Sequence, residues 1–138
     1  MDHKIAYFGA GCFWHSELIF SKVPGVLDTE VGYGQAPQTN GEIVSSVEVV
    51  KVSYDPSLVD YETLIDTFWT THNPANPSNK NMQNIERSTL FTLNDTQNKV
   101  AKRTLEKKAS YQEVYTSIVE LSDYRKAPEK DQKYYFKS

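Results

Sequence analysis

The stretch that decides the fold is Lys4-Ile5-Ala6-Tyr7-Phe8-Gly9-Ala10-Gly11-Cys12-Phe13-Trp14. Its first half, residues 4–8, is β-branched and aromatic, and it predicts a short strand that the glycines at 9 and 11 interrupt. From Cys12 onward the apolar residues follow a helical spacing, so a helix is expected to run to about Pro24-Gly25. The sequence therefore predicts a strand that turns into a helix at its only cysteine.

Cys12 is expected in the first turn of that helix. The N–H groups there have no partner within the helix, and the helix dipole favours an anion. In general a thiol at such a place ionises readily, and the thiolate is the nucleophile. The two glycines beside it would let a ligand approach the backbone closely. One interpretation is a reactive cysteine; the other is a small buried apolar residue, which a lone cysteine often is.

Working outward from this stretch, the chain alternates strands and helices. Four further strands are predicted, at residues 26–33, 45–54, 88–93 and 115–121. Two further helices are predicted, at residues 60–71 and 94–109, the second with Asn94 as a candidate N-cap. This order predicts an α+β fold, a two-layer sandwich of a mainly antiparallel sheet with helices packed on one face, and a ferredoxin-like core.

Two connections lack regular structure. Residues 34–41 form a loop in which Asn40-Gly41 suits a tight turn. Residues 72–86 are polar and rich in Asn and Pro, and a loop of that length in a compact domain usually has a function unless it is disordered. The tail from Ser122 is charged and rich in tyrosine.

Glu48 is out of place in the predicted strand 45–54. Val50, Val52 and Tyr54 point to one face, and Glu48 has their parity. If that face packs on the helices, one carboxyl group sits on the apolar side. The alternative is an exposed carboxylate at a bulge.

Bulk composition bounds the class of protein. A chain of 138 residues is predicted to form one domain, 1–138. With 15 basic and 18 acidic residues and no basic patch, nucleic acid is not an expected partner. Met1 to Lys4 leads straight into the first strand, no apolar run could span a membrane, and a single cysteine fits a reducing compartment. A cytoplasmic monomer is expected.

Gly11-Cys12-Phe13-Trp14 followed by Glu17 resembles the active-site signature of the A-type peptide methionine sulfoxide reductases. Further segments resemble that family in the same order: Pro24-Gly25-Val26, Val31-Gly32-Tyr33, residues 47–56, His72-Asn73-Pro74, Arg87-Ser88, and a tail with Ala127, Glu129, Gln132 and Tyr134-Tyr135. The resemblance covers almost the whole chain and implies a core of the same kind.

The resemblance implies roles for two residues. The Cys12 thiolate would attack the sulfoxide sulfur, and Glu48 would protonate the oxygen, because a buried carboxyl group can hold a proton near neutral pH. Methionine would leave, and Cys12 would remain as a sulfenic acid. The expected activity is reduction of the S-epimer of methionine sulfoxide, free or in proteins.

Phe13 and Trp14 would form the apolar wall around the S-methyl group of the substrate, since sulfur and methyl groups pack well on aromatic rings. The alternative for both is plain core packing. Glu17 is interpreted as a helix-face or buried hydrogen-bonding residue and Tyr33 as structural. The three histidines have no metal-ligand spacing and are interpreted as surface or capping residues.

The chain departs from the family where the sulfoxide oxygen is held. The tyrosine expected before the Glu48 strand has only Asn40 or no equivalent, and the histidine expected two residues before Glu48 is Ser46. The nearest matches to an Asp-containing stretch that ends in a tyrosine are Asn81 and Glu86, which become candidate substrate-binding residues. Asp131 replaces a tail histidine. Each lost hydroxyl donor could cost on the order of 10²-fold in rate.

Recycling is the second departure. The family often resolves the sulfenic acid with a second cysteine in the tail, and this sequence has none. An external thiol would then reduce Cys12, either thioredoxin or glutathione with glutaredoxin. No metal or prosthetic cofactor is expected.

Two other functions remain open from the sequence. A degenerate relative could bind a sulfoxide or a methionine-bearing partner without turnover, which the missing tyrosines favour. A thiol peroxide sensor could oxidise Cys12 directly, although peroxide needs no aromatic pocket for a methyl group.

Overall fold

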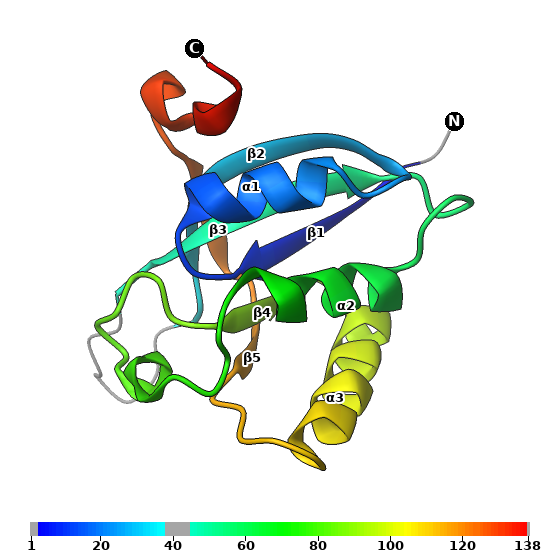
Figure 1. Cartoon of the computed structure of the whole chain (residues 1–138), viewed down its shortest axis with the longest axis vertical. Helices are drawn as coiled ribbons and strands as arrows, with labels where there is room; N and C mark the ends of the chain where they lie inside the picture. Colours follow the sequence, from blue (N-terminus) through cyan, green and yellow to red (C-terminus); the bar gives the residue numbers. More distant parts are fainter. Residues whose placement is uncertain (1–2, 38–44, 138) are drawn as a thin grey trace.

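The computed structural model describes residues 3–37 and 45–137, and its centre is one mixed sheet (Figure 1). The strands lie in the order β5-β4-β1-β3-β2-β6, and β4 with β5 is the one parallel pair among them. Their bounds are β1 Lys4–Gly9, β2 Val26–Gln35, β3 Val47–Tyr54, β4 Thr89–Thr92, β5 Ser117–Glu120 and β6 Asp123–Lys126.

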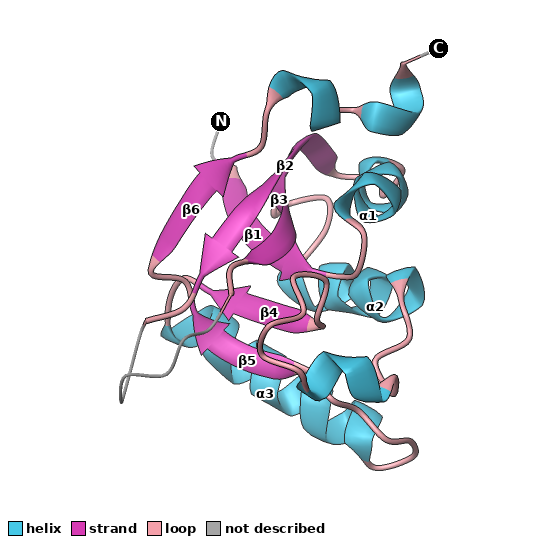
Figure 2. Ribbon diagram, turned by 90° about the vertical axis from the view of Figure 1, so that its left-hand side faces the viewer, coloured by secondary structure: helices cyan, strands magenta, loops and turns pink. Residues whose placement is uncertain are grey.

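Within the described residues, three α-helices pack on the sheet, and side chains of all three belong to the same core cluster. They are α1 Phe13–Ser21, α2 Tyr61–Thr71 and α3 Asp95–Ala109. Figure 2 shows α1 and α2 to one side of the sheet. The N-caps of α2 and α3 are Asp60 and Asn94, whose side chains accept from the third amide of the helix. Three short 3₁₀ segments complete the described elements: η1 Pro77–Lys80, η2 Glu129–Asp131 and η3 Tyr134–Phe136. No helix in residues 3–37 or 45–137 combines the length and apolarity needed to cross a membrane.

The main core lies between the sheet and the helices, with Phe8 of β1 in its middle. The Phe8 ring stacks on Phe20 of α1 at a centroid distance of 4.8 Å and lies 5.9 Å from Phe68 of α2. Val50 on β3 faces this core, whereas its neighbour Val49 belongs to a smaller cluster on the opposite face. The predicted alternation of β3 and the two-layer α+β fold are therefore confirmed.

The tail is more ordered than the sequence predicts. β6 pairs antiparallel with β2, with Gly34 opposite Tyr124 and Gly32 opposite Lys126. A side chain at Gly32 would begin 2.6 Å from the Tyr124 ring, so glycine is needed for this close approach. The β6 sequence Asp-Tyr-Arg-Lys has no strand periodicity of its own, and it is extended because it pairs with β2. The predicted turn at Asn40-Gly41 lies outside the described residues.

Candidate functional site

Cys12 occupies the turn between β1 and α1 that the sequence predicts. Gly11 has φ 77°, a conformation that suits glycine, and Cys12 is the extended N-cap residue of α1. Ser16 ties the turn together, because its hydroxyl donates to Ala10 O at 2.5 Å and its amide donates to Cys12 O at 3.1 Å. The thiol is half-buried and free. It thus lies at a helix N-terminus, where a negative charge is favoured.

Glu48 lies next to this turn, on the helix-covered face of the sheet. Its Oε1 atom accepts a hydrogen bond from Phe13 N at 3.3 Å. The pairing of β2 with β3 is regular at Glu48, which lies opposite Tyr33, and its only irregularity is between Val26 and Asp28. The alternative of an exposed carboxylate at a bulge is therefore wrong.

The environment of Glu48 favours its protonated form. Burial raises its pKa most strongly, and the nearby carboxylates of Glu86 and Asp131 raise it further. The hydrogen bond from Phe13 N, which favours the charged form, opposes both effects. The structure therefore brings together a helix-terminal thiol and a carboxyl group that retains its proton to a higher pH than usual.

The two candidate wall residues differ in exposure. Phe13 is 5% exposed, belongs to the main core, and packs against Tyr33 at 5.7 Å between ring centroids. Trp14 is half-buried at the edge of that core, 6.5 Å from Phe13. Trp14 therefore offers more accessible aromatic surface beside Cys12, whereas Phe13 is mainly part of the core.

The tail supplies two contacts to Trp14 that the sequence did not predict. The indole Nε1 donates to Asp131 Oδ1 at 3.2 Å, and the Tyr134 ring stacks on the indole at 3.9 Å with an interplanar angle of 10°. The sequence offers only a weak signal for Asp131 and Tyr134. The resemblance to the family includes the tyrosine, whereas Asp131 stands in place of a family histidine. Their separation from Trp14 by 117 residues and more hides the contact from any local pattern.

Asn81 and Glu86 are both exposed and line one polar cavity. The cavity has a volume of about 440 Å³ and borders Gly11; its other lining residues are His72, Asn73, Asn76, Ser78, Asn79 and Asn84. Asn81 Oδ1 accepts from Gln83 N at 3.0 Å, which orients the amide. Glu86 is the member of this pair that acts on Glu48 electrostatically, whereas Asn81 belongs to the cavity wall.

His72 supports the Gly11 turn from beneath. A Cβ added at Gly11 would lie 3.5 Å from that of His72. The ring nitrogens contact the hydroxyls of Thr71 at 2.9 Å and Ser88 at 2.6 Å. Burial lowers the pKa of His72 to about 4, so the ring is neutral. His72 is the C-cap residue of α2, as the capping interpretation predicts, and no group of three or more metal-ligating side chains occurs within residues 3–37 and 45–137.

Proteins of known family resemble almost the whole chain. The family model described as peptide methionine sulfoxide reductase matches residues 4–138. The chain is 39% identical to "Peptide methionine sulfoxide reductase MsrA" of Methanococcus maripaludis (strain C7), covering 97% of this chain and 92% of that protein. It is 37% identical to "Peptide methionine sulfoxide reductase A2" of Arabidopsis thaliana, covering 98% of this chain and 67% of that protein.

Solved structures share the fold. The reduced form of Mxr1 from Saccharomyces cerevisiae superposes with a TM-score of 0.78 at 25% identity, covering 96% of this chain and 83% of that one. Mxr1 in its complex with Trx2 superposes with a TM-score of 0.71, also at 25% identity, over 94% of this chain and 84% of that one.

Proposed function

Because the chain belongs to the peptide methionine sulfoxide reductase family, we propose that it reduces methionine S-sulfoxide with Cys12 as nucleophile and Glu48 as acid. Family membership makes it a thiol-dependent oxidoreductase. The observation that carries the assignment of residues is the hydrogen bond from Phe13 N to Glu48 Oε1. It holds a carboxyl group with a raised pKa beside the residue that bears the thiol.

The reaction transfers one oxygen atom and two electrons. Cys12 Sγ attacks the sulfoxide sulfur while Glu48 gives its proton to the sulfoxide oxygen. The sulfur–oxygen bond breaks, the protonated oxygen passes to Sγ, and methionine leaves. Cys12 is then a sulfenic acid and Glu48 a carboxylate. The cysteine sulfur has lost the two electrons that the sulfoxide sulfur has gained.

The electrostatics of the site favour these reaction steps. Cys12 lies at the N-terminus of α1, on the side from which its sulfur can attack the substrate. A neutral Glu48 does not repel the Cys12 thiolate, and it carries the proton that the leaving oxygen needs. Trp14, next to Phe13, packs against the S-methyl group, which a sulfoxide shares with the methionine product.

We assign oxygen and substrate binding to groups that differ from the family's hydroxyls. Glu86 is the nearest match to the family's tyrosine, and its charge raises the pKa of Glu48. Asn81 presents an oriented amide to the cavity beside Gly11. The Asn81 amide N–H can donate to the sulfoxide oxygen, whereas the Glu86 carboxylate can only accept a hydrogen bond, from an N–H of the substrate. Neither group reproduces a phenol. This difference favours a rate below that of relatives with the tyrosines.

Regeneration uses an external thiol. Cys12 is the only cysteine in the 138 residues, so no second thiol of this sequence can attack the sulfenic acid. Two thiol groups of the reductant supply two electrons, which yields the Cys12 thiol, a disulfide in the reductant and one water. A thioredoxin, or glutathione with glutaredoxin, fits this role. The solved complex of Mxr1 with Trx2 supports the first choice.

A single-turnover assay tests the proposal. The pre-reduced protein is mixed with S- or R-methionine sulfoxide without any reductant, and methionine and the mass of the protein are measured. The expected result is one methionine per protein from the S-epimer, with 16 Da (roughly one oxygen atom) added at Cys12. The Cys12→Ser variant should form no methionine.

A second candidate function is binding of the sulfoxide without turnover, which the loss of hydroxyl donors at positions such as Glu86 favours. A folded wild-type protein that yields no methionine from either epimer would overturn the reductase. It would leave the binding function, provided that the S-epimer still binds with the same affinity to wild type and Cys12→Ser.

A further inference from the structure

The tail that follows β6 is anchored by a buried amide. The Gln132 side chain is 8% exposed and bonds to both polar groups of one β2 residue: Val31 N donates to its Oε1 at 2.9 Å, and its Nε2 donates to Val31 O at 2.8 Å. The Nε2 atom also donates to Ala127 O at 3.0 Å. This anchor supplies the partner of Val31 N and, together with the bond from Ala127 N to Val31 O at 3.0 Å, fastens the tail to β2.

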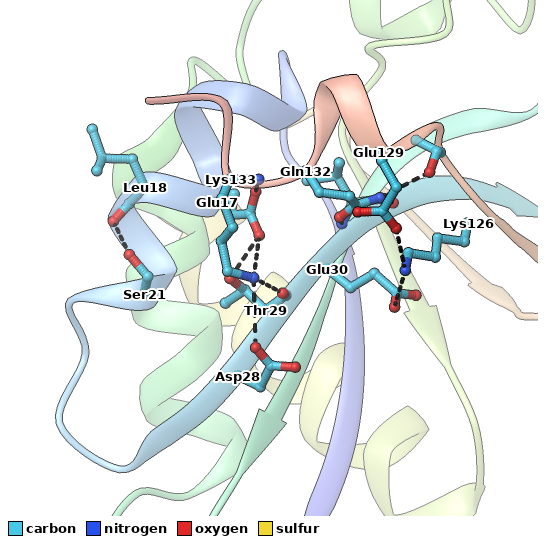
Figure 3. Close-up of polar contacts among 12 residues, drawn as sticks. Glu17, Leu18, Ser21, Asp28, Thr29, Glu30, Lys126, Glu129, Gln132 and Lys133 are labelled. Carbon is cyan, nitrogen blue, oxygen red and sulfur yellow. Dashed lines mark hydrogen bonds and ion pairs between the residues drawn. The ribbon is translucent and has the colours of Figure 1, made fainter. Parts of the chain in front are cut away.

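A buried carboxylate on α1 forms the second anchor. Glu17 is 1% exposed, which confirms its interpretation as a buried hydrogen-bonding residue, and it accepts from Lys133 N at 2.9 Å, Lys133 Nζ at 3.1 Å and Thr29 Oγ1 at 2.7 Å. Figure 3 shows Lys133 reaching down from the tail to Glu17, with further contacts to Thr29 O and to Asp28. Lys133 itself has φ 53°, so its backbone is bent to make both contacts.

The residues that touch Trp14 are the immediate neighbours of these anchors. Asp131 precedes Gln132 and accepts from the indole Nε1, and Tyr134 follows Lys133 and stacks on the indole. The two residues that contact Trp14 therefore flank the two anchor residues, Gln132 and Lys133, in the sequence. Because the anchors hold this short segment on β2 and α1, both contacts to Trp14 are held as well. Tyr134 remains 42% exposed, so its ring contributes more to covering Trp14 than to the core.

We propose that Asp131 and Tyr134 are positioning residues that hold the Trp14 indole with one face covered and the other turned to the S-methyl group of the substrate. This rests on the proposed function. A ring stacked at 3.9 Å and 10° excludes any other group from that face. The hydrogen bond at Nε1 prevents rotation of the indole about its own axis. The tail is therefore part of the substrate pocket, although it contributes no reacting group.

Four substitutions separate positioning from general stability. They are made in a Trp69→Phe background, in which Trp14 is the single tryptophan. Tyr134→Ala removes the stacked ring, Tyr134→Phe keeps it, and Asp131→Ala removes the acceptor. Phe136→Ala is the matched control, because Phe136 lies in the same η3 turn, is 53% exposed and has no ring contact with Trp14 in the described structure.

Two quantities are measured for each variant. The first is KM and kcat for N-acetyl-methionine S-sulfoxide methylamide, and the second is quenching of Trp14 fluorescence by acrylamide. Tyr134→Ala and Asp131→Ala should raise KM by roughly 3- to 10-fold, the size of one aromatic or hydrogen-bonding contact. Quenching should increase in parallel, while kcat changes less than KM. Tyr134→Phe should restore the wild-type values, and Phe136→Ala should match its background.

The proposal is overturned if both variants fold and keep the KM of the background, whether or not quenching rises. It is also overturned if Phe136→Ala raises KM as much as Tyr134→Ala, which would show a general loosening of the tail. Inactivity of the folded wild-type protein toward either epimer would instead overturn the proposed function. The Kd of the same sulfoxide, read from Trp14 fluorescence, then decides the tail proposal, because that Kd must still rise in Tyr134→Ala.

Discussion

The Glu48 carboxyl group caps the helix that begins directly after Cys12: its Oε1 atom accepts from Phe13 N at 3.3 Å. The peptide unit that joins Cys12 to Phe13 thus links the thiol-bearing residue to the acid. This hydrogen bond restricts where the Glu48 carboxyl group can lie relative to the backbone of Cys12. Preorganisation of this kind lowers the entropic cost of bringing nucleophile and acid to the substrate together.

Replacing Glu48 with Gln should leave the cap and remove the acid. The amide oxygen of Gln can still accept from Phe13 N, but it has no proton to give to the sulfoxide oxygen. We expect kcat to fall by roughly 10²- to 10⁴-fold, the usual contribution of a general acid, with a smaller change in KM. Single-turnover kinetics with the S-epimer check this, and a variant with a wild-type rate would remove Glu48 from the mechanism.

The same substitution should change stability in a pH-dependent way. Burial raises the pKa of Glu48 in the folded protein, so stability falls as the pH rises from the ordinary value for a carboxyl group through the raised one. The Glu48→Gln variant does not lose stability in this way, because the glutamine side chain does not ionise. Urea unfolding should therefore find the variant more stable relative to wild type at pH 7.5 than at pH 4, and an opposite trend would contradict the raised pKa.

Glu86→Gln should shift the alkaline limb of the rate profile. The Glu86 carboxylate raises the pKa of Glu48, so its removal lowers that pKa. Activity that needs protonated Glu48 should then decline at a lower pH than in wild type. The profile of kcat/KM against pH measures this, with Glu106→Gln on the exposed side of α3 as the charge-matched control. A limb that stays in place would show that Glu86 does not act on the acid.

His72 should make the fold sensitive to acid. Its folded pKa of about 4 lies below the ordinary 6.5, so the neutral ring stabilises the fold above pH 6.5. This stability should be lost as the pH falls from about 6.5 through about 4, and its full size is on the order of 3 kcal/mol. Urea unfolding between pH 7 and pH 4 should show a smaller decline for His72→Gln than for wild type. The exposed His15→Gln serves as the control, and equal declines would exclude His72 as the cause.

Tyr61→Phe should not weaken the protein despite its buried site. The Tyr61 hydroxyl is buried without a hydrogen-bond partner in the described structure, and burial of an unsatisfied polar group costs free energy. Removing it while keeping the ring should be neutral or should stabilise the fold by about 1 kcal/mol. The midpoint of urea unfolding measures the change, and a loss of more than about 1 kcal/mol would reveal a partner for the hydroxyl.

Local patterns predicted the parts of the fold that depend on neighbouring residues. The alternation of β3 placed Glu48 on the helix face, and Asn94 caps α3 as its side chain suggests. The turn at Cys12 follows from its two glycines and the apolar spacing after them. Each of these features is determined by side chains within a few positions of one another, which is the range in which periodicity and capping are informative.

The tail shows where such reasoning ends. Three of the four residues of β6 are charged, and the strand exists because β2 offers a free edge and a glycine at position 32. The roles of Asp131 and Tyr134 depend on Trp14, which lies at the other end of the sequence. The effect of Glu86 on Glu48 likewise requires knowing that a loop and a strand meet. None of these contacts leaves a local signature.

The hydrogen bond between Trp14 and Asp131 spans 117 positions of the chain, and this has a consequence for synthesis. During translation Cys12 and its turn leave the ribosome early, whereas Asp131 and Tyr134 follow more than a hundred residues later. At roughly 5–20 residues per second, the thiol exists for several seconds before its pocket can close. A nascent chain therefore carries the Cys12 thiol before the wall that selects its substrate has formed.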